Sequence, residues 1–125
     1  DVLVVRVEKL VTEEVWQARY NQINAFEKML AAEGPTLLKF YLHISKKEQK
    51  ERLEERLHDP TKQWKFALGD LKTREKWDDY KVAVDEMLFR TSTRKAPWTV
   101  VAANSKEYAR LAVLRTVAEA MEKAL

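Results

Sequence analysis

The sequence predicts an α/β protein with a parallel sheet, and three observations support this fold class. Segments with helical periodicity alternate with short apolar runs, in the order helix, strand, helices, strand, helix. The two runs, residues 37–44 and 98–102, are nearly continuous in apolar and aromatic side chains, which is typical of strands covered on both faces. The segment between them is long enough for a right-handed crossover connection. At 125 residues, the chain is one domain at most.

The N-terminal third contains a short apolar run and one strongly periodic helix. Residues 2–7 are β-branched and apolar, which by itself favours a strand. Thr12 is suited to cap the helix that follows, and Gly34-Pro35 is expected to end it. The predicted inner face of this helix repeats at three- and four-residue steps: Trp16, Tyr20, Ile23, Phe26 and Leu30.

The middle of the chain is dominated by charged helices. Residues 45–48, Ser-Lys-Lys-Glu, follow the first strand and have the pattern of a capping box, and Asp59-Pro60 ends the charged helix that they open. Residues 61–70 are polar. Gly69-Asp70 is typical of a turn and N-cap before one long helix, whose predicted inner residues are Trp77, Tyr80, Val84, Met87 and Leu88.

The C-terminal third supplies the second strand and a last helix. Residues 91–97 interrupt the preceding helix, and residues 98–102 form the second predicted strand. Asn104-Ser105 is expected to open the final helix. Its apolar face is predicted to point inward and consists of Tyr108, Leu111, Leu114, Val117 and Met121.

The composition restricts the function classes. The chain is 46% hydrophobic and 34% charged, with a net charge of +3 and a mean hydropathy of −0.51. It has no cysteine, which excludes disulfides, thiolate catalysis and cysteine metal sites, and two histidines are too few for a histidine-built metal site. No membrane span or secretory signal is found, so we expect a cytoplasmic protein without a membrane partner. With only Gly34 and Gly69, these residues contain no glycine-rich phosphate loop.

Cationic side chains gather around the predicted strand ends. In open parallel sheets, ligands bind beyond the carboxyl ends of the strands, which places residues 45–47 and 104–106 on one edge. The crossover is longer than one helix requires, and such extra length is typical of a lid or binding loop. Its cations are suited to phosphate oxygens: Arg52, Arg56, Lys62, Lys65, Lys72 and Arg74.

Structural explanations exist for the same residues. A charged run such as 46–56 is also typical of a solvated helix face with i,i+4 ion pairs. Trp64 lies in a polar segment between lysines, where it could stack on a base or hold the lid in place. His43 fits an interior or edge position of a strand, and His58 fits the end of a helix. The acids interleaved among the cations argue against a nucleic-acid patch.

Three segments, in this order and spacing, resemble the polyphosphate kinase 2 family. The first runs from Leu38-Lys39-Phe40 through Gln49 to Arg56. The second comprises residues 59–66, 69–71 and 77–80. The third is Thr91-Ser92-Thr93 with residues 96–101. Together they cover nearly the whole chain.

The resemblance implies a P-loop kinase fold, thymidylate kinase-like, with three α/β/α layers. Residues 1–125 would be its C-terminal part: about two parallel strands, flanking helices and a helical lid at about residues 52–92. The Walker A and Walker B segments are expected upstream, so the fragment alone is expected to be inactive. The family pattern also makes the segment after Walker B partly helical, against the strand favoured for residues 2–7.

The resemblance further implies an activity and its partners. The family transfers a phosphoryl group between inorganic polyphosphate and a nucleoside mono- or diphosphate (AMP, ADP, ATP or guanine equivalents). It uses Mg²⁺, whose ligands are expected in the upstream part, and it is usually oligomeric, so a homo-oligomer is expected. No nucleic-acid partner is expected. Two alternatives stay open: another P-loop kinase for nucleotides or small molecules, and a non-catalytic basic module that binds nucleic acid.

Residue roles follow from the same resemblance. Arg56 matches a lid-side arginine that acts on phosphate, Lys62 and Lys65 match basic lid positions, and Arg6 matches a basic residue after Walker B. We therefore predict Arg56 and Lys65 as catalytic residues. The predicted phosphate-binding residues are Arg6, Arg52, Lys62 and Lys106.

Overall fold

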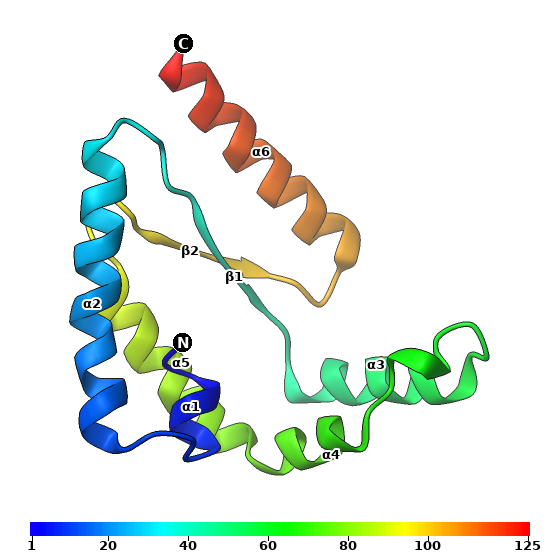
Figure 1. Cartoon of the computed structure of the whole chain (residues 1–125). Coiled ribbons are helices and arrows are strands. Elements are labelled where there is room, and N and C mark those ends of the chain that lie inside the picture. Colours follow the sequence, from blue (N-terminus) through cyan, green and yellow to red (C-terminus); the bar gives the residue numbers. More distant parts are fainter.

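A computed structural model describes residues 1–125 and confirms the α/β class (Figure 1). The elements are α1 (Val4–Val7), α2 (Glu13–Ala32), β1 (Lys39–His43), α3 (Lys46–His58), the 3₁₀ turn η1 (Gln63–Lys65), α4 (Leu68–Glu75), α5 (Trp77–Thr91), β2 (Trp98–Ala102) and α6 (Lys106–Ala124). No helix among them combines the length and the apolar character needed to cross a membrane.

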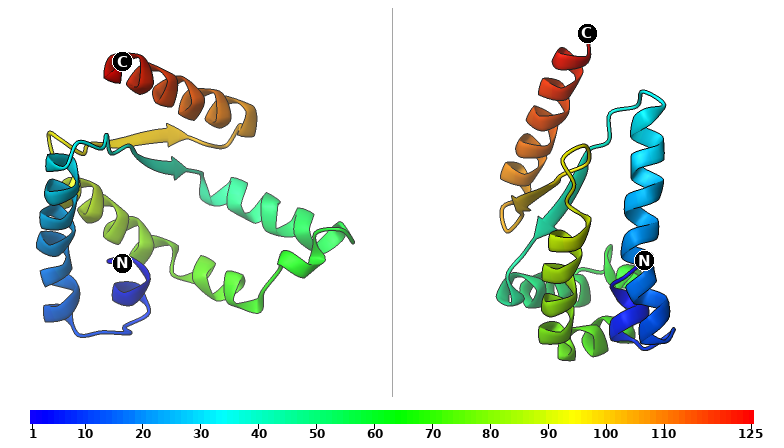
Figure 2. Two further views of the ribbon diagram at one scale, coloured as in Figure 1. Left: turned by 45° about the horizontal axis from the view of Figure 1, so that its top comes forward. Right: turned by 90° about the vertical axis from the view of Figure 1, so that its left-hand side faces the viewer.

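The two strands form a parallel pair with helices on both faces. The register runs from Lys39 opposite Trp98 to His43 opposite Ala102. Helix α6 lies over one face, and α5 with α2 lies on the other (Figure 2). The α3–η1–α4–α5 segment is the predicted long crossover, and it extends well beyond the strand ends (Figure 1).

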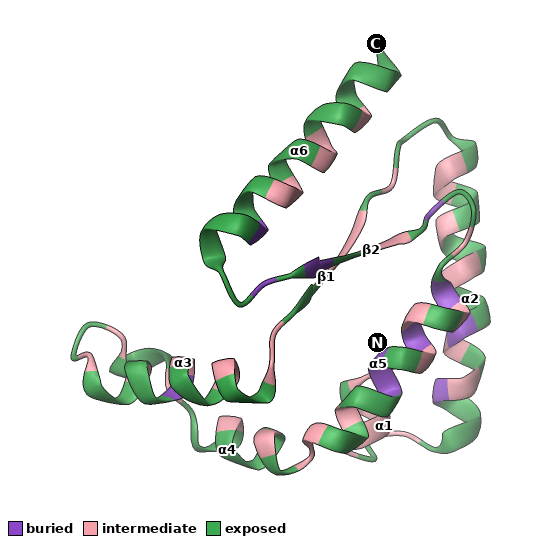
Figure 3. Ribbon diagram, turned by 180° about the vertical axis from the view of Figure 1, so that it is seen from behind, coloured by how far each residue is buried: buried purple, intermediate pink, exposed green.

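The main core lies where α2 meets α5. It is built from Val2, Trp16, Tyr20 and Met87, all at most 9% exposed. A second, smaller cluster of Val101, Ala103 and Ala109 joins β2 to α6. Buried positions are concentrated in these two places, and most of α6 and α3 is exposed (Figure 3). Gly34 ends α2 as predicted, with φ at +106°, a conformation that favours glycine.

The N-terminal segment is helical, so the strand expected from residues 2–7 alone is wrong and the family pattern is confirmed. Asp1 Oδ1 accepts hydrogen bonds from the backbone N–H of Leu3 (2.8 Å) and Val4 (3.3 Å). Val2 is buried in the main core, and Val5 packs against the same cluster. Packing against α2 and α5 outweighs the strand propensity of a short β-branched run.

The predicted single helix after Gly69-Asp70 is divided into α4 and α5. Helix α4 begins at Leu68, so Asp70 lies in its first turn, where its carboxylate accepts from the N–H of Ala67 (3.3 Å). The chain bends at Lys76 (φ −92°, ψ 20°), and α5 starts at Trp77. The bend turns α4 back alongside α3, which the periodicity of the sequence did not reveal.

The apolar face of α6 is exposed, contrary to the prediction. Tyr108, Leu111, Leu114 and Met121 are 57–65% exposed. The helices cover the two faces of the strands only in part, since Leu42 and Val100 are 54% and 56% exposed.

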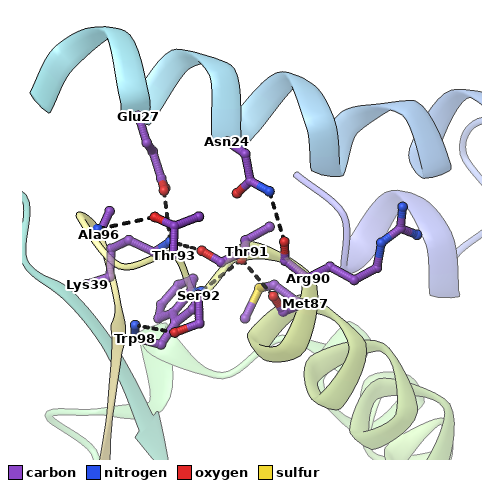
Figure 4. Close-up of polar contacts among 10 residues, drawn as sticks. All are labelled: Asn24, Glu27, Lys39, Met87, Arg90, Thr91, Ser92, Thr93, Ala96 and Trp98. Atoms are coloured by element: carbon purple, nitrogen blue, oxygen red, sulfur yellow. Dashed lines mark hydrogen bonds and ion pairs between the residues drawn. The ribbon is translucent and has the colours of Figure 1, made fainter. Parts of the chain in front are cut away.

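A buried polar network fixes the N-terminal ends of the strands (Figure 4). The Thr91 hydroxyl donates to the Met87 carbonyl (2.6 Å) and accepts from Trp98 Nε1 (2.8 Å). Lys39 Nζ donates to the Thr91 carbonyl (2.5 Å) and to Glu27 Oε2 (2.9 Å), and it lies 4.8 Å from the centroid of the Trp98 ring. These contacts tie α2, α5 and both strands together, at the end of the sheet opposite α3.

Candidate strand-end phosphate site

The two strand ends meet at one edge, as the sequence predicted. The Ser45 N–H donates to Asn104 Oδ1 (3.0 Å), which joins the β1–α3 turn to the β2–α6 turn. Ser45 Oγ caps α3 by accepting from the Glu48 N–H (3.1 Å), and Ser105 Oγ caps α6 by accepting from the Tyr108 N–H (3.2 Å). The positive ends of both helix dipoles therefore lie at this rim, where negative charge is favoured.

Arg52 holds α3 against the rim. Its Nε donates to Glu48 Oε1 (2.7 Å), and its Nη2 donates to the carbonyls of Ala103 (2.6 Å) and Asn104 (3.3 Å). Most of its donors are therefore used within the chain. Its predicted contact with phosphate stays a prediction, while its contribution to the geometry of the rim is direct.

Arg56 lies one helical turn further along α3 and is differently placed. Its side chain is 40% exposed and makes no hydrogen bond within the chain. Its nearest acid is Asp70 on α4, with 3.9 Å between Nη1 and Oδ2. Both residues line a cavity of about 210 Å³ between α3 and α4, together with Gln49, Arg52 and Thr73. An arginine with free donors beside a cavity can bind a phosphate in a bidentate manner.

Lys62 and Lys106 converge on Glu55 from different elements. Lys62 forms a salt bridge with Glu55 and lies 3.4 Å from Asp59 Oδ2. The hydrogen bond from Lys62, its charge and the charge of Lys106 lower the pKa of Glu55. The hydrogen bond with Glu55 raises the pKa of Lys62. The outer part of α3 thus carries a cluster of mixed charge in which Lys62 is already paired.

Lys65 lies at the far end of α3, in η1. Its Nζ is 5.1 Å from the ring centroid of Trp64, which is 78% exposed. Trp64 Nε1 donates to the Thr61 carbonyl (2.9 Å) within the same segment. Both interpretations of Trp64, stacking on a base and holding the lid in place, stay predictions. Helix α3 has 13 residues, which at 1.5 Å per residue corresponds to about 20 Å. Lys65 therefore lies beyond the end of α3 that is far from the rim, whereas Lys62 reaches back along α3 to Glu55.

The solvated-face explanation is confirmed for part of the charged run. Lys47 pairs with Glu51 (3.8 Å) and Lys50 pairs with Glu54 (3.6 Å), both at i,i+4 spacing and more than half exposed. These pairs are ordinary surface contacts. The cations of α3 therefore divide into a solvated face and the side that carries Arg52 and Arg56.

Arg6 is not brought together with the other predicted cations. Its guanidinium stacks 4.3 Å from the Trp16 ring, donates to the Tyr20 hydroxyl (3.2 Å) and pairs with Glu86 (2.5 Å). It lies among α1, α2 and α5. Its predicted phosphate contact stays a prediction, and within this chain its donors are used in packing.

The Arg6–Glu86 contact leads to a pH prediction. Burial acts to raise the pKa of Glu86, but hydrogen bonds from Arg6 and Arg90 and their charges lower it overall. A carboxyl group with a lowered folded-state pKa stabilises the fold above its unfolded pKa of about 4.3 and loses this contribution as the pH falls through the folded value. In denaturant melts of the full-length protein from pH 7 to 3, the free energy of unfolding should fall more steeply with decreasing pH in wild type than in Glu86→Gln. Equal slopes would contradict this assignment.

Sequence reasoning missed three features of the site. Asp70 was predicted as a helix cap, and its position facing Arg56 depends on the bend at Lys76. The side-chain contact of Asn104 with the first strand end joins residues 59 positions apart. A second cavity of about 450 Å³ lies between the sheet and α5, lined in part by Tyr41, Trp77 and Tyr80. None of these features has a signal in local spacing.

No group of three or more histidine, cysteine, aspartate or glutamate side chains in the chain is arranged to hold a metal ion.

The comparison with protein families decides the relationship. The family model described as "Polyphosphate kinase 2 (PPK2)" matches residues 1–125. The chain belongs to the polyphosphate kinase 2 family. The fold agrees: the crystal structure of polyphosphate kinase 2 from Arthrobacter aurescens TC1 superimposes with a TM-score of 0.94 at 46% identity, over 98% of this chain and 44% of that one.

Two relatives named as polyphosphate phosphotransferases are similar over almost the entire chain. The "AMP/ADP-polyphosphate phosphotransferase" of Meiothermus ruber is 52% identical over 122 residues, which is 98% of this chain and 46% of that protein. The "Polyphosphate:AMP phosphotransferase" of Pseudomonas syringae pv. tomato is 47% identical over 98% of this chain and 25% of its own length. The chain thus spans less than half of the length of these relatives. The crystal structures that it matches have the P-loop kinase fold that the resemblance implied.

Proposed function

We propose that this chain is part of a polyphosphate kinase that moves a phosphoryl group between inorganic polyphosphate and a nucleoside mono- or diphosphate. The observation that carries the proposal is Arg56, an arginine with free donors beside a cavity, in a chain matched throughout by the polyphosphate kinase 2 family. Relatives named for this reaction are 52% and 47% identical.

The residues contribute charge and position rather than covalent chemistry. Phosphoryl transfer requires in-line placement of donor and acceptor and positive charge on the transferring group. Arg56 binds phosphate oxygens as a planar fork, and Lys65 neutralises charge further along an extended polyanion. Arg52 and Asn104 hold the rim against which the reacting phosphates lie. Residues 52–92 act as the lid and exclude water, which would otherwise hydrolyse the phosphoanhydride.

The remaining partners complete the proposal. Inorganic polyphosphate enters as an extended anion, which fits cations spread along about 20 Å of α3. AMP, ADP or their guanine equivalents are the acceptors. Mg²⁺ would be held by ligands outside residues 1–125, as the resemblance to the family implies. The full-length protein acts in the cytoplasm as a homo-oligomer.

A donor screen tests the function. The full-length protein, incubated with AMP or ADP, is expected to form ADP or ATP when polyphosphate is the donor, as measured by chromatography of the nucleotides. Transfer from ATP to another acceptor, with none from polyphosphate, would favour a different P-loop kinase. Tight nucleic-acid binding with a steep salt dependence, and no transfer at all, would favour the non-catalytic basic module.

A further inference from the structure

We propose that Asp70 pairs with Arg56 in the absence of substrate and that phosphate replaces Asp70 as the partner of Arg56 when the polyanion binds. Asp70 thereby sets the affinity of the site for the polyanion. The inference rests on the proposed function and adds a residue that determines affinity at that site. Its basis is the pairing between α3 and α4, which lines the 210 Å³ cavity on both sides.

The Arg56–Asp70 contact is loose. The closest N···O distance is 3.9 Å, without a hydrogen bond, and the two side chains are 40% and 38% exposed. On the same helix, Arg52 is hydrogen-bonded to Glu48 (2.7 Å) and is only 25% exposed. A half-exposed pair at this distance contributes little to stability. An incoming phosphate forms charge-assisted hydrogen bonds with the guanidinium and therefore displaces Asp70 easily.

Release of Arg56 requires no movement of α4. The helix has a second connection to α3: Arg74 Nη1 donates to the Lys46 carbonyl (2.6 Å) and to Gln49 Oε1 (3.3 Å). Asp70 itself stays anchored, because its Oδ2 accepts from the N–H of Ala67 (3.3 Å), the residue that precedes α4. The exchange therefore involves a change of partner for one guanidinium, with both helices in place.

The geometry determines the test. Asn at position 70 keeps an oxygen that caps α4 and removes the charge that faces Arg56, so Asp70→Asn separates the two roles of the side chain. Glu75→Gln is the matched control, since it removes the same charge from an exposed position on α4 without a partner. Tripolyphosphate binding to the full-length protein is measured by calorimetry, and the KM for polyphosphate is measured separately from kcat.

Asp70→Asn should tighten tripolyphosphate binding about two- to fivefold, the range expected when an exposed pair no longer competes. The KM for polyphosphate should fall by a similar factor, and Glu75→Gln should leave both values unchanged. In an Arg56→Ala background, the effect of Asp70→Asn should vanish.

Three results would overturn the role of Asp70: weaker or unchanged binding in Asp70→Asn, an equal gain in Glu75→Gln, or a gain that persists without Arg56. Failure of the proposed function looks different. In that case the wild-type protein itself neither binds tripolyphosphate nor uses polyphosphate as a donor.

Discussion

Arg56→Ala in the full-length protein should lower kcat/KM for polyphosphate-dependent transfer about a hundredfold or more. The side chain makes no hydrogen bond within the chain and only a loose, exposed ion pair with Asp70 (3.9 Å), so its removal takes donors from the phosphate at little cost to the fold. The loss should fall mainly on kcat if Arg56 acts on the transferring phosphoryl group, and on KM if it only holds the polyanion.

Two further variants sharpen this result. Arg56→Lys should recover only part of the activity, because an ammonium group keeps the charge and lacks the planar fork. Arg115→Ala removes an exposed arginine from the middle of α6, far along the helix from the rim, and should have no effect. A loss of less than about threefold in Arg56→Ala would remove this residue from the reaction.

Lys39→Met should destabilise the protein by about 3 kcal/mol or more. The Lys39 and Glu27 side chains are 9% and 16% exposed and paired at 2.9 Å, and the same ammonium group donates to the Thr91 carbonyl. Removal of the cation leaves a carboxylate and a carbonyl without their partner in a nearly dry site. Guanidinium melts of the full-length protein give the change in the free energy of unfolding.

Matched variants distinguish this explanation from a general effect of losing a lysine. Lys47→Met breaks the exposed pair with Glu51 and should change stability by less than about 0.5 kcal/mol. The double variant Lys39→Met with Glu27→Leu removes both charges and should recover much of the loss. A loss in Lys39→Met no larger than in Lys47→Met would contradict the network of Figure 4.

Much of the fold could be predicted because it depends on local patterns. The four-residue step from Trp16 to Tyr20 is typical of the helix α2, and Ser45 and Ser105 cap their helices as the sequence indicated. The strand near residue 40 was recognisable as a continuous apolar run. Where the prediction failed, long-range packing decided: residues 2–7 fold as a helix because Val2 is buried against α2 and α5.

The position of the site could be predicted from the sequence, but the bonding partners of its side chains could not. The rim followed from the rule for parallel strand ends, and Ser45 and Asn104 confirm it. Sequence spacing could not reveal that Arg52 is bonded to the Ala103 carbonyl, 51 residues away, or that Arg6 pairs with Glu86, 80 residues away. A sequence shows which side chains are charged. Which partner each charged side chain is bonded to depends on the folded structure.

The bare apolar side of α6 has a consequence for handling the polypeptide. Tyr108, Leu111 and Leu114 form an exposed apolar surface next to the exposed Leu42 of β1. Surfaces of this kind drive association in solution. Residues 1–125, prepared by themselves, are expected to aggregate at concentrations where a protein with a polar surface remains monomeric.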